Sequence, residues 1–238
     1  MLSSASVAMA VYNGELFLPL QIESILNQLH PNDELVISYD DSTDSTLNII
    51  SEFASKDDRV RIIRNSCPGI IGNFNNAIAH CSNDVIFISD QDDIWIDGKR
   101  DIVINALNES GADLLIHNVV HINSGGDIIS RPLFELYGIG PGLIRNFTKP
   151  RYSGCCMAFP KTSERIIMPM PQNVDCYDHW IGVACEAFGR VTFIDDILLE
   201  HRLHGENATV NTRPLQKLIQ QRWNLLVELI KRGRGLSQ

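Results

Sequence analysis

The sequence predicts an α/β fold whose core is a doubly wound, mostly parallel sheet with helices on both faces. Short apolar runs alternate with segments whose apolar residues recur at helical spacing through the first hundred residues, a pattern typical of strand–helix–strand units. One run, Val85–Ser89, is β-branched and aromatic, as in a buried strand. Polar stretches, two of them rich in acids, follow three of the runs, at the edge where such sheets bind ligands.

Four strands and four helices are expected to alternate in the first half. The strands are predicted at 6–11, 34–38, 60–64 and 85–89. The helices carry these apolar residues on one face: Ile22, Ile25, Leu26 and Leu29; Leu47, Ile50 and Ala54; Phe74, Ala77, Ile78 and Cys81; and those of 98–110. Pro19 suits the first turn of the first helix, and Thr43 or Asp44 can cap the second. Right-handed crossovers bring the ends of all four strands to one edge of the sheet.

The second half is less regular. A strand at 113–123 precedes a glycine turn and a short returning strand, and the segment 134–152, with several Gly and Pro, predicts a loop. The remaining elements are strands at 156–159, 191–194 and 197–204 and a helix from near Asp178 to Phe188. No linker or repeat divides the chain, so we expect one domain, 1–212, followed by an amphipathic basic helix, 213–238.

Composition excludes several classes of protein. The chain has 238 residues, 44% of them hydrophobic and 21% charged, which fits one folded domain and excludes disorder. The net charge of −9 argues against nucleic acid as a partner. The six cysteines show no paired metal spacing, and Cys81 and Cys185, on apolar positions of expected helices, predict buried thiols rather than disulfides. The chain shows no signal peptide and no run of transmembrane length, so we expect a cytoplasmic protein.

Three carboxylates, Asp90, Asp92 and Asp93, follow directly after the strand at 85–89. Their mutual repulsion and loss of water are costly unless a cation resolves them. Alternate residues of an extended segment share a side, so Asp90 and Asp92 can hold one divalent ion, with oxygen ligands favouring Mg²⁺ or Mn²⁺. Such an ion takes its other ligands from phosphates, which predicts a metal-bound diphosphate. A solvated turn is the competing interpretation, whereas a calcium-binding EF-hand loop is excluded because Ile94 and Trp95 occupy its ligand and glycine positions.

Five motifs, in this order, resemble those of the family 2 inverting glycosyltransferases, and especially the rhamnosyltransferase-like bacterial branch that builds surface polysaccharides. They are "VAMAVYNGELFLPLQIESILNQ", "ISYDDSTDST", "IIGNFNNAIAHCSNDVIFISDQDDIW", "SGCCMAF" and "YDHWIGVACEAFGRVTFIDDILLEHRLHGENAT". The resemblance covers roughly residues 5–210. It implies a GT-A type fold, with a nucleotide-sugar-binding half at 1–110 and an acceptor-binding half at 111–212.

The resemblance also implies a donor, UDP- or dTDP-sugar, and a cofactor, Mn²⁺ or Mg²⁺. Asp90 and Asp92 match the family's metal motif, and His204 matches a histidine near the metal and the diphosphate. The residues implied at the nucleotide-sugar are Tyr12, Asn13, Asp40, Asp41, Asp90 and Gln91. Arg64, at the end of the strand predicted at 60–64, could also approach the nucleotide. One departure concerns the donor loop, because Tyr39 and Asp41 stand where the family has an acid and a glycine. Asp41 would carry some cost if that position needs a positive φ.

Asp178 matches the catalytic base of the family. At the start of a helix it could instead cap that helix, and both roles can hold. The helix dipole should favour its ionised form, which makes it a weaker base. His179 and Trp180 follow it and could line the acceptor site, although Trp180 could equally belong to the core.

The acceptor is expected to be a hydroxyl of a glycan or of a lipid-linked oligosaccharide, in O-antigen or capsule synthesis. A basic amphipathic helix at 213–238 fits contact with the inner face of the cytoplasmic membrane, or simple packing on the domain. Two rival functions remain. A nucleotidyltransferase would carry a glycine-rich basic loop where this chain has "YNGELF", and a non-catalytic nucleotide-sugar-binding module would tolerate loss of Asp178.

Overall fold

The computed structural model describes residues 1–204 and 214–237. The strands are β1 (Ala5–Val11), β2 (Glu34–Tyr39), β3 (Val60–Arg64), β4 (Val85–Ser89), β5 (Ile94–Trp95), β6 (Leu114–Ile122), β7 (Met157–Pro160) and β8 (Val191–Arg202). The helices are α1 (Leu18–Leu26), α2 (Thr46–Lys56), α3 (Ile70–Ala79), α4 (Lys99–Ser110), α5 (Leu133–Tyr137), α6 (Leu143–Thr148), α7 (Glu164–Ile167), α8 (Tyr177–Phe188) and α9 (Leu215–Leu236), with 3₁₀ turns η1 (Gly154–Cys156) and η2 (Lys161–Ser163).

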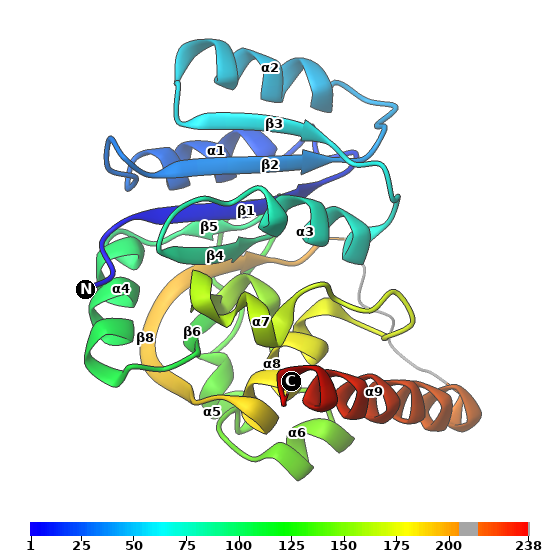
Figure 1. Ribbon diagram of the computed structural model, residues 1–238. Helices are drawn as coiled ribbons and strands as arrows, with labels where there is room; N and C mark the ends of the chain where they lie inside the picture. The colour runs from blue at the N-terminus through cyan, green and yellow to red at the C-terminus, as the bar shows by residue number, and fades with distance from the viewer. Residues whose placement is uncertain (205–213, 238) are drawn as a thin grey trace.

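The strands form one sheet in the order β3-β2-β1-β4-β7-β6-β8-β5. In its first half β1 pairs in parallel with β2 and β4, and β2 pairs in parallel with β3. All seven residues of β1 are buried, because helices cover both faces; Figure 1 shows α3 in front of the sheet and α1 behind it. The chain order reverses between β1 and β4, and the carboxyl ends of these two strands therefore open a crevice. The predicted doubly wound sheet is confirmed here.

The second half makes the sheet mixed. β7 runs antiparallel to both β4 and β6, β5 runs antiparallel to β8, and β6 and β8 are parallel. β8 is a single curved strand (Figure 1) that continues through the exposed Asp195 and Asp196, where the sequence predicted two strands. Its register against β6 shifts on both sides of Asn118, so the irregularity lies in the pairing and not in a break of the strand.

The segment from 123 to 152 also differs from expectation. The predicted returning strand is reduced to one bridge between Ile122 and Ile128. The expected loop contains two short helices, α5 and α6, each entered or left through a glycine with positive φ, Gly138 (φ 59) and Gly142 (φ 147). The glycines that predicted a loop therefore mark helix ends.

Helix α9 is present, as predicted, and packs beside α7 and α8 (Figure 1). Leu225 and Leu229 are its buried anchors. The Arg232 guanidinium donates to the carbonyl oxygen of Ile166 at 3.0 Å and lies 5.3 Å from the ring centre of Trp180. Arg213, which the sequence placed in this helix, lies outside the described residues. No described helix is long and apolar enough to cross a membrane.

Candidate active site

The loops after β1 and β4 are joined at the crevice by the Gln91 amide. Its Nε2 donates to the Tyr12 carbonyl oxygen at 2.9 Å, and its Oε1 accepts from the Tyr12 backbone N–H at 2.8 Å. A Cβ at Gly14 would lie 2.7 Å from Gln91 Oε1, so any other residue at this position would displace the Gln91 amide. Asn13 takes a left-handed backbone, φ 46, and its Oδ1 accepts from the Thr43 backbone N–H at 2.9 Å. Tyr12, Asn13 and Gln91 therefore share one rigid corner.

The loop after β2 forms the next wall of the crevice. The Asp40 carboxylate accepts from Asn65 Nδ2 at 2.7 Å and from the Gly69 backbone N–H at 2.9 Å. Arg64 binds Asp41 through two hydrogen bonds, of 2.9 and 2.5 Å, and this partner lowers the pKa of the exposed Asp41 carboxyl. Asp41 is not among the residues with positive φ. The chain thus avoids the backbone cost that its replacement of glycine could have carried.

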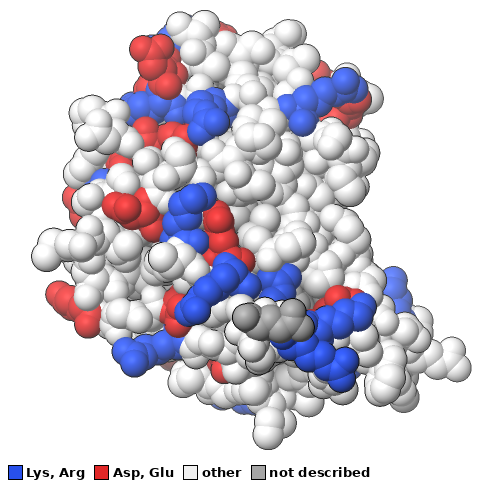
Figure 2. Space-filling model, in the orientation of Figure 1, with Lys and Arg blue, Asp and Glu red and all other residues white. Residues whose placement is uncertain are grey.

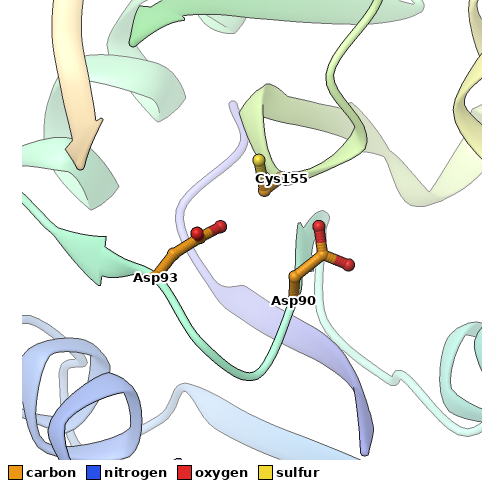
Figure 3. Close-up of side chains that lie close together, drawn as sticks. All are labelled: Asp90, Asp93 and Cys155. Carbon is orange, nitrogen blue, oxygen red and sulfur yellow. The ribbon is translucent and has the colours of Figure 1, made fainter. Parts of the chain in front are cut away.

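An acidic cluster, in which Asp93 is buried and Asp90 half-buried, lies at the end of β4. Asp90, Asp93 and Cys155 each offer a ligand atom within 4.8 Å of the others, and their side chains converge from the β4–β5 loop and from η1 (Figure 3). Burial, followed by the charges of Asp93 and Asp92, raises the pKa of Asp90 to about 8. Burial, followed by the charge of Asp92, raises the pKa of Asp93 to about 7. The protein alone does not stabilise both carboxylates in their charged forms.

This cluster fits a divalent cation. Asp93 is fully buried; its Oδ1 accepts from the Arg202 backbone N–H at 3.1 Å, while Oδ2 has no hydrogen-bond partner among the described residues. The buried Lys99 stands nearby, but its ammonium donates to the Cys155 carbonyl oxygen at 3.0 Å and lies 4.4 Å from the Trp95 ring centre. Burial lowers the pKa of Lys99 to about 8. A cation would therefore find carboxylate oxygens whose charge the chain leaves incompletely compensated.

Asp92 points to a different partner. Its Oδ2 lies 2.8 Å from His204 Nε2, and the His204 ring stacks at 5.1 Å against Phe17. The sequence grouped Asp90, Asp92 and His204 as one metal set, and the structure brings Asp92 together with His204 but places Asp90 beside Asp93. Asp93 was not singled out as a ligand, although it belongs to the same acidic run. Cys155 carried no signal beyond the "SGCC" motif.

The start of α8 reaches the same cluster. The Tyr177 hydroxyl donates to Asp90, 3.0 Å from Oδ1 and 3.2 Å from Oδ2. A Cβ at Gly154 would lie 2.2 Å from the Tyr177 ring. The ring therefore occupies the space that a side chain at position 154 would need. Sequence reasoning missed Tyr177, whose only signal was its place beside Asp178.

Asp178 is the second residue of α8, and Cys176 occupies the N-cap position. Asp178 Oδ1 accepts from the His179 backbone N–H at 2.6 Å, so the carboxylate lies in the first turn without capping the helix. Burial raises the pKa of Asp178. This is opposite to the sequence expectation, because burial of the carboxyl outweighs the hydrogen bonds from Cys176 and the His179 backbone N–H, and it makes the carboxylate a stronger base.

His179 and Trp180 make internal contacts. The His179 Nε2–H donates to the Asn146 carbonyl oxygen at 3.0 Å, and Trp180 Nε1–H donates to that of Ile167 at 2.8 Å. Their exposed fractions are 2% and 0%. Both side chains therefore belong to the interior packing behind Asp178 and do not lie on the exposed surface around it.

A mixed sheet with acid-rich loops at the β1–β4 switch point is the fold of the GT-A glycosyltransferases. The structure superposes on the crystal structure of S. aureus TarS 1-349 in complex with UDP with a TM-score of 0.72, at 16% identity over 96% of this chain and 65% of that one. Residues 6–191 match the model of Glycosyl transferase family 2, and the chain belongs to this family.

Two bacterial relatives match about half of the chain. One is the UDP-Glc:alpha-D-GlcNAc-diphosphoundecaprenol beta-1,3-glucosyltransferase WfgD of Escherichia coli, 32% identical over 50% of this chain and 47% of its own. The other is the dTDP-rhamnosyl transferase RfbG of Shigella flexneri, 37% identical over 47% of this chain and 41% of its own. This chain spans less than two thirds of the length of these proteins and of TarS 1-349.

The raised pKa values predict how pH and metal act on stability. Without a cation, folded Asp90 and Asp93 hold protons that the unfolded chain has released, so the free energy of unfolding falls as pH rises to about 8. We expect Mn²⁺ at about 100 times its Kd to restore about 2.7 kcal/mol at pH 8, and much less at pH 5, where protons compete. Thermal melting with Mn²⁺ and with a chelator at both pH values measures this.

Asp90→Asn should reduce the stabilisation by Mn²⁺ at pH 8, whereas Asp127→Asn, which alters an exposed turn carboxylate, should not. Equal stabilisation of the wild type at pH 5 and pH 8 would show that the cluster is not the metal site.

Proposed function

We propose that this protein transfers a sugar from a nucleotide-diphosphate sugar to a hydroxyl of a glycan or lipid-linked acceptor, with inversion, in bacterial O-antigen or capsule synthesis. The observation that carries the proposal is the hydrogen bond from Tyr177 to Asp90, because it joins the first turn of the helix that bears Asp178 to the acidic cluster. Residues 1–110 would hold the donor and 111–212 the acceptor. The names of the two relatives, one acting with UDP-Glc and one with dTDP-rhamnose, support a UDP- or dTDP-sugar donor.

The donor site is assembled from loops that the sheet brings together. The corner of Tyr12, Asn13 and Gln91 and the wall of Asp40 offer backbone and side-chain groups to a base and ribose. Arg64, paired with Asp41 at the rim, places a guanidinium where a phosphate can approach. Asp90 and Asp92, with His204 beside Asp92, would hold the cation, Mn²⁺ or Mg²⁺. When bound, that ion neutralises the charge that develops on the departing diphosphate.

Asp178 would take the proton from the acceptor hydroxyl. A sugar hydroxyl is a poor nucleophile at neutral pH, and a single displacement at the anomeric carbon needs a base on the acceptor side. The raised pKa of Asp178 brings the carboxylate closer to the strength that this task needs. Its neighbours His179 and Trp180 fix the first turn of α8 through their own hydrogen bonds, which orients the carboxylate.

The two rival functions predict different behaviour. A non-catalytic binding module would bind the nucleotide without turnover, and a nucleotidyltransferase would need a basic, glycine-rich loop after β1. That loop is instead closed by the Gln91 amide against Tyr12, which favours the transferase.

The first test concerns the donor. We expect UDP to bind at least about tenfold more weakly to Asp92→Ala than to wild type when Mn²⁺ is present, because one ligand of the cation is lost. Titration calorimetry of UDP with and without Mn²⁺ measures the difference. Asp97→Ala, which removes an exposed carboxylate from the same segment, is the matched control. Unchanged affinity in Asp92→Ala would remove Asp92 from the metal site.

The second test concerns the base. Asp178→Asn keeps the size of the side chain and removes the proton acceptor, so transfer should fall by roughly 10²-fold or more, with near-normal UDP binding and a melting temperature within a few degrees of wild type. Transfer by the wild type should be lost on acidification at a higher pH than an ordinary aspartate would give, because Asp178 must be ionised and burial raises its pKa.

Asp175→Asn is the control for this test, since Asp175 lies just before α8 and accepts a hydrogen bond from Gln221 Nε2 at 2.6 Å. If Asp178→Asn transfers sugar nearly as well as wild type, the base lies elsewhere.

We further propose that α9 touches the inner face of the cytoplasmic membrane, where a lipid-linked acceptor would lie. Four of its exposed apolar residues recur at spacings of four, three and four, which keeps them on one face; they are Ile219, Trp223, Leu226 and Ile230. The helix carries five basic residues and one acid, in a chain of net charge −9. Figure 2 shows Lys and Arg side chains gathered over the lower part of the molecule, where Figure 1 places α7, α8 and α9. An apolar stripe with basic flanks suits an anionic bilayer.

Replacing exposed residues tests this contact without disturbing the packing of α9. Trp223→Ser with Ile230→Ser should reduce sedimentation with phosphatidylglycerol vesicles severalfold, because each lost side chain removes about 1.5–3 kcal/mol of apolar burial at most. Transfer to a soluble acceptor should be unchanged. The control pair, Ile128→Ser with Ile129→Ser, removes equally exposed apolar residues elsewhere. Equal loss of vesicle binding in both pairs would contradict the assignment to α9.

A further inference from the structure

Cys155 is an unusual member of an oxygen-rich metal cluster. Its thiol is 2% exposed and lies with Asp90 and Asp93 within the 4.8 Å span that one ion can bridge. Antiparallel pairing of β7 with β4, Phe87 opposite Ala158, brings η1 beside the end of β4, and Figure 3 shows the sulfur on the side of the cluster opposite the β4–β5 loop. Lys99 donates to the carbonyl oxygen of Cys155, which leaves the sulfur facing the carboxylates.

A second observation points to a ligand at this place. Asp93 Oδ2 is fully buried and has no hydrogen-bond partner among the described residues. His201 Nε2 approaches Asp93 Oδ1 to 4.0 Å from β8. The cluster itself offers a thiol and two carboxylates, and a thiolate ligand suits a borderline or soft divalent ion.

We propose that Asp90, Asp93 and Cys155 form a binding site for a thiophilic divalent cation, Zn²⁺ or Cd²⁺, distinct from the Asp92–His204 position. On binding, the Cys155 S–H bond breaks, the sulfur lone pair forms the bond to the metal, and the proton passes to solvent. Mg²⁺ and Mn²⁺ prefer oxygen and gain little from the sulfur. Cys155 is therefore a residue that determines metal selectivity.

The consequence for activity depends on the proposed function. Asp90 belongs both to this cluster and to the predicted metal motif, so an ion held by Cys155 draws Asp90 away from Asp92. Zn²⁺ should accordingly antagonise Mn²⁺-dependent binding of UDP. The binding test below needs neither donor nor turnover. It can therefore fail while the glycosyltransferase proposal stands, and it can succeed if the glycosyltransferase proposal is wrong.

The experiment uses Cd²⁺ as the probe, because a cadmium–thiolate bond has a charge-transfer band in the ultraviolet. Cys67 is exposed and would bind Cd²⁺ itself, so every protein carries Cys67→Ser. In this background we expect one equivalent of Cd²⁺ to produce the band. Adding Cys155→Ser should abolish the band and lower the ratio of Cd²⁺ to Mn²⁺ affinity, measured by competition, by about tenfold or more.

Cys81→Ser is the matched control, since that buried thiol donates to the Ala77 carbonyl oxygen at 3.4 Å, a bond that serine can replace. It should keep the band. Circular dichroism checks folding, and Cys155→Ala provides a second variant if serine is not tolerated. A band that survives in both Cys155 variants, or an affinity ratio that they leave unchanged, would overturn the proposal.

Discussion

The placement of carboxylate charge at the end of a buried strand is the constraint on which the rest of the site depends. Asp90 and Asp93 follow β4 into a region with little water, where burial raises the pKa of each toward or above neutrality. Three polar groups lie around the cluster. The Tyr177 hydroxyl donates to Asp90, the Arg202 backbone N–H donates to Asp93, and the Lys99 ammonium donates to the carbonyl oxygen of Cys155. These contacts leave the charge of the ionised carboxylates incompletely compensated, and the cluster therefore fits a cation.

The sheet explains how distant parts of the chain meet there. Parallel strands in the first half place the loops after β1, β2 and β4 at one edge, and the change to antiparallel pairing at β7 turns the second half back over that edge. β8 then runs beside β6 and brings Arg202, and His204 just beyond its end, to the acidic loop. Residues from both halves of the chain consequently meet in a single cluster.

The sequence pattern predicted the features that depend on residues close together in the chain, namely the strands and helices of the first half and the residues at their ends. Apolar periodicity located β1 to β4 and their helices, and the rule for parallel sheets brought Tyr12, Asn13, Asp40 and Gln91 to one crevice. The pattern placed Asp93 in the acidic run but did not pair it with Asp90. It did not predict Cys155 and Tyr177 at the cluster, because their positions depend on the packing of β7 and α8 against elements far away in the sequence. The pKa of Asp178 was also predicted in the wrong direction. Its place at the start of a helix is visible in the sequence, whereas the burial that raises its pKa exists only after α8 has packed.

Gly154 has a consequence for how the chain can vary. The space that a Cβ would need at this position is filled by the Tyr177 ring, so a side chain at 154 and an aromatic ring at 177 exclude each other. Because the ring also carries the hydroxyl that meets Asp90, the two positions should covary: a chain that gains a side chain at 154 must shrink residue 177 and give up this link to the acid. Pairs of substitutions at 154 and 177 would thus separate homologues that keep the link from those that orient the acid by another route.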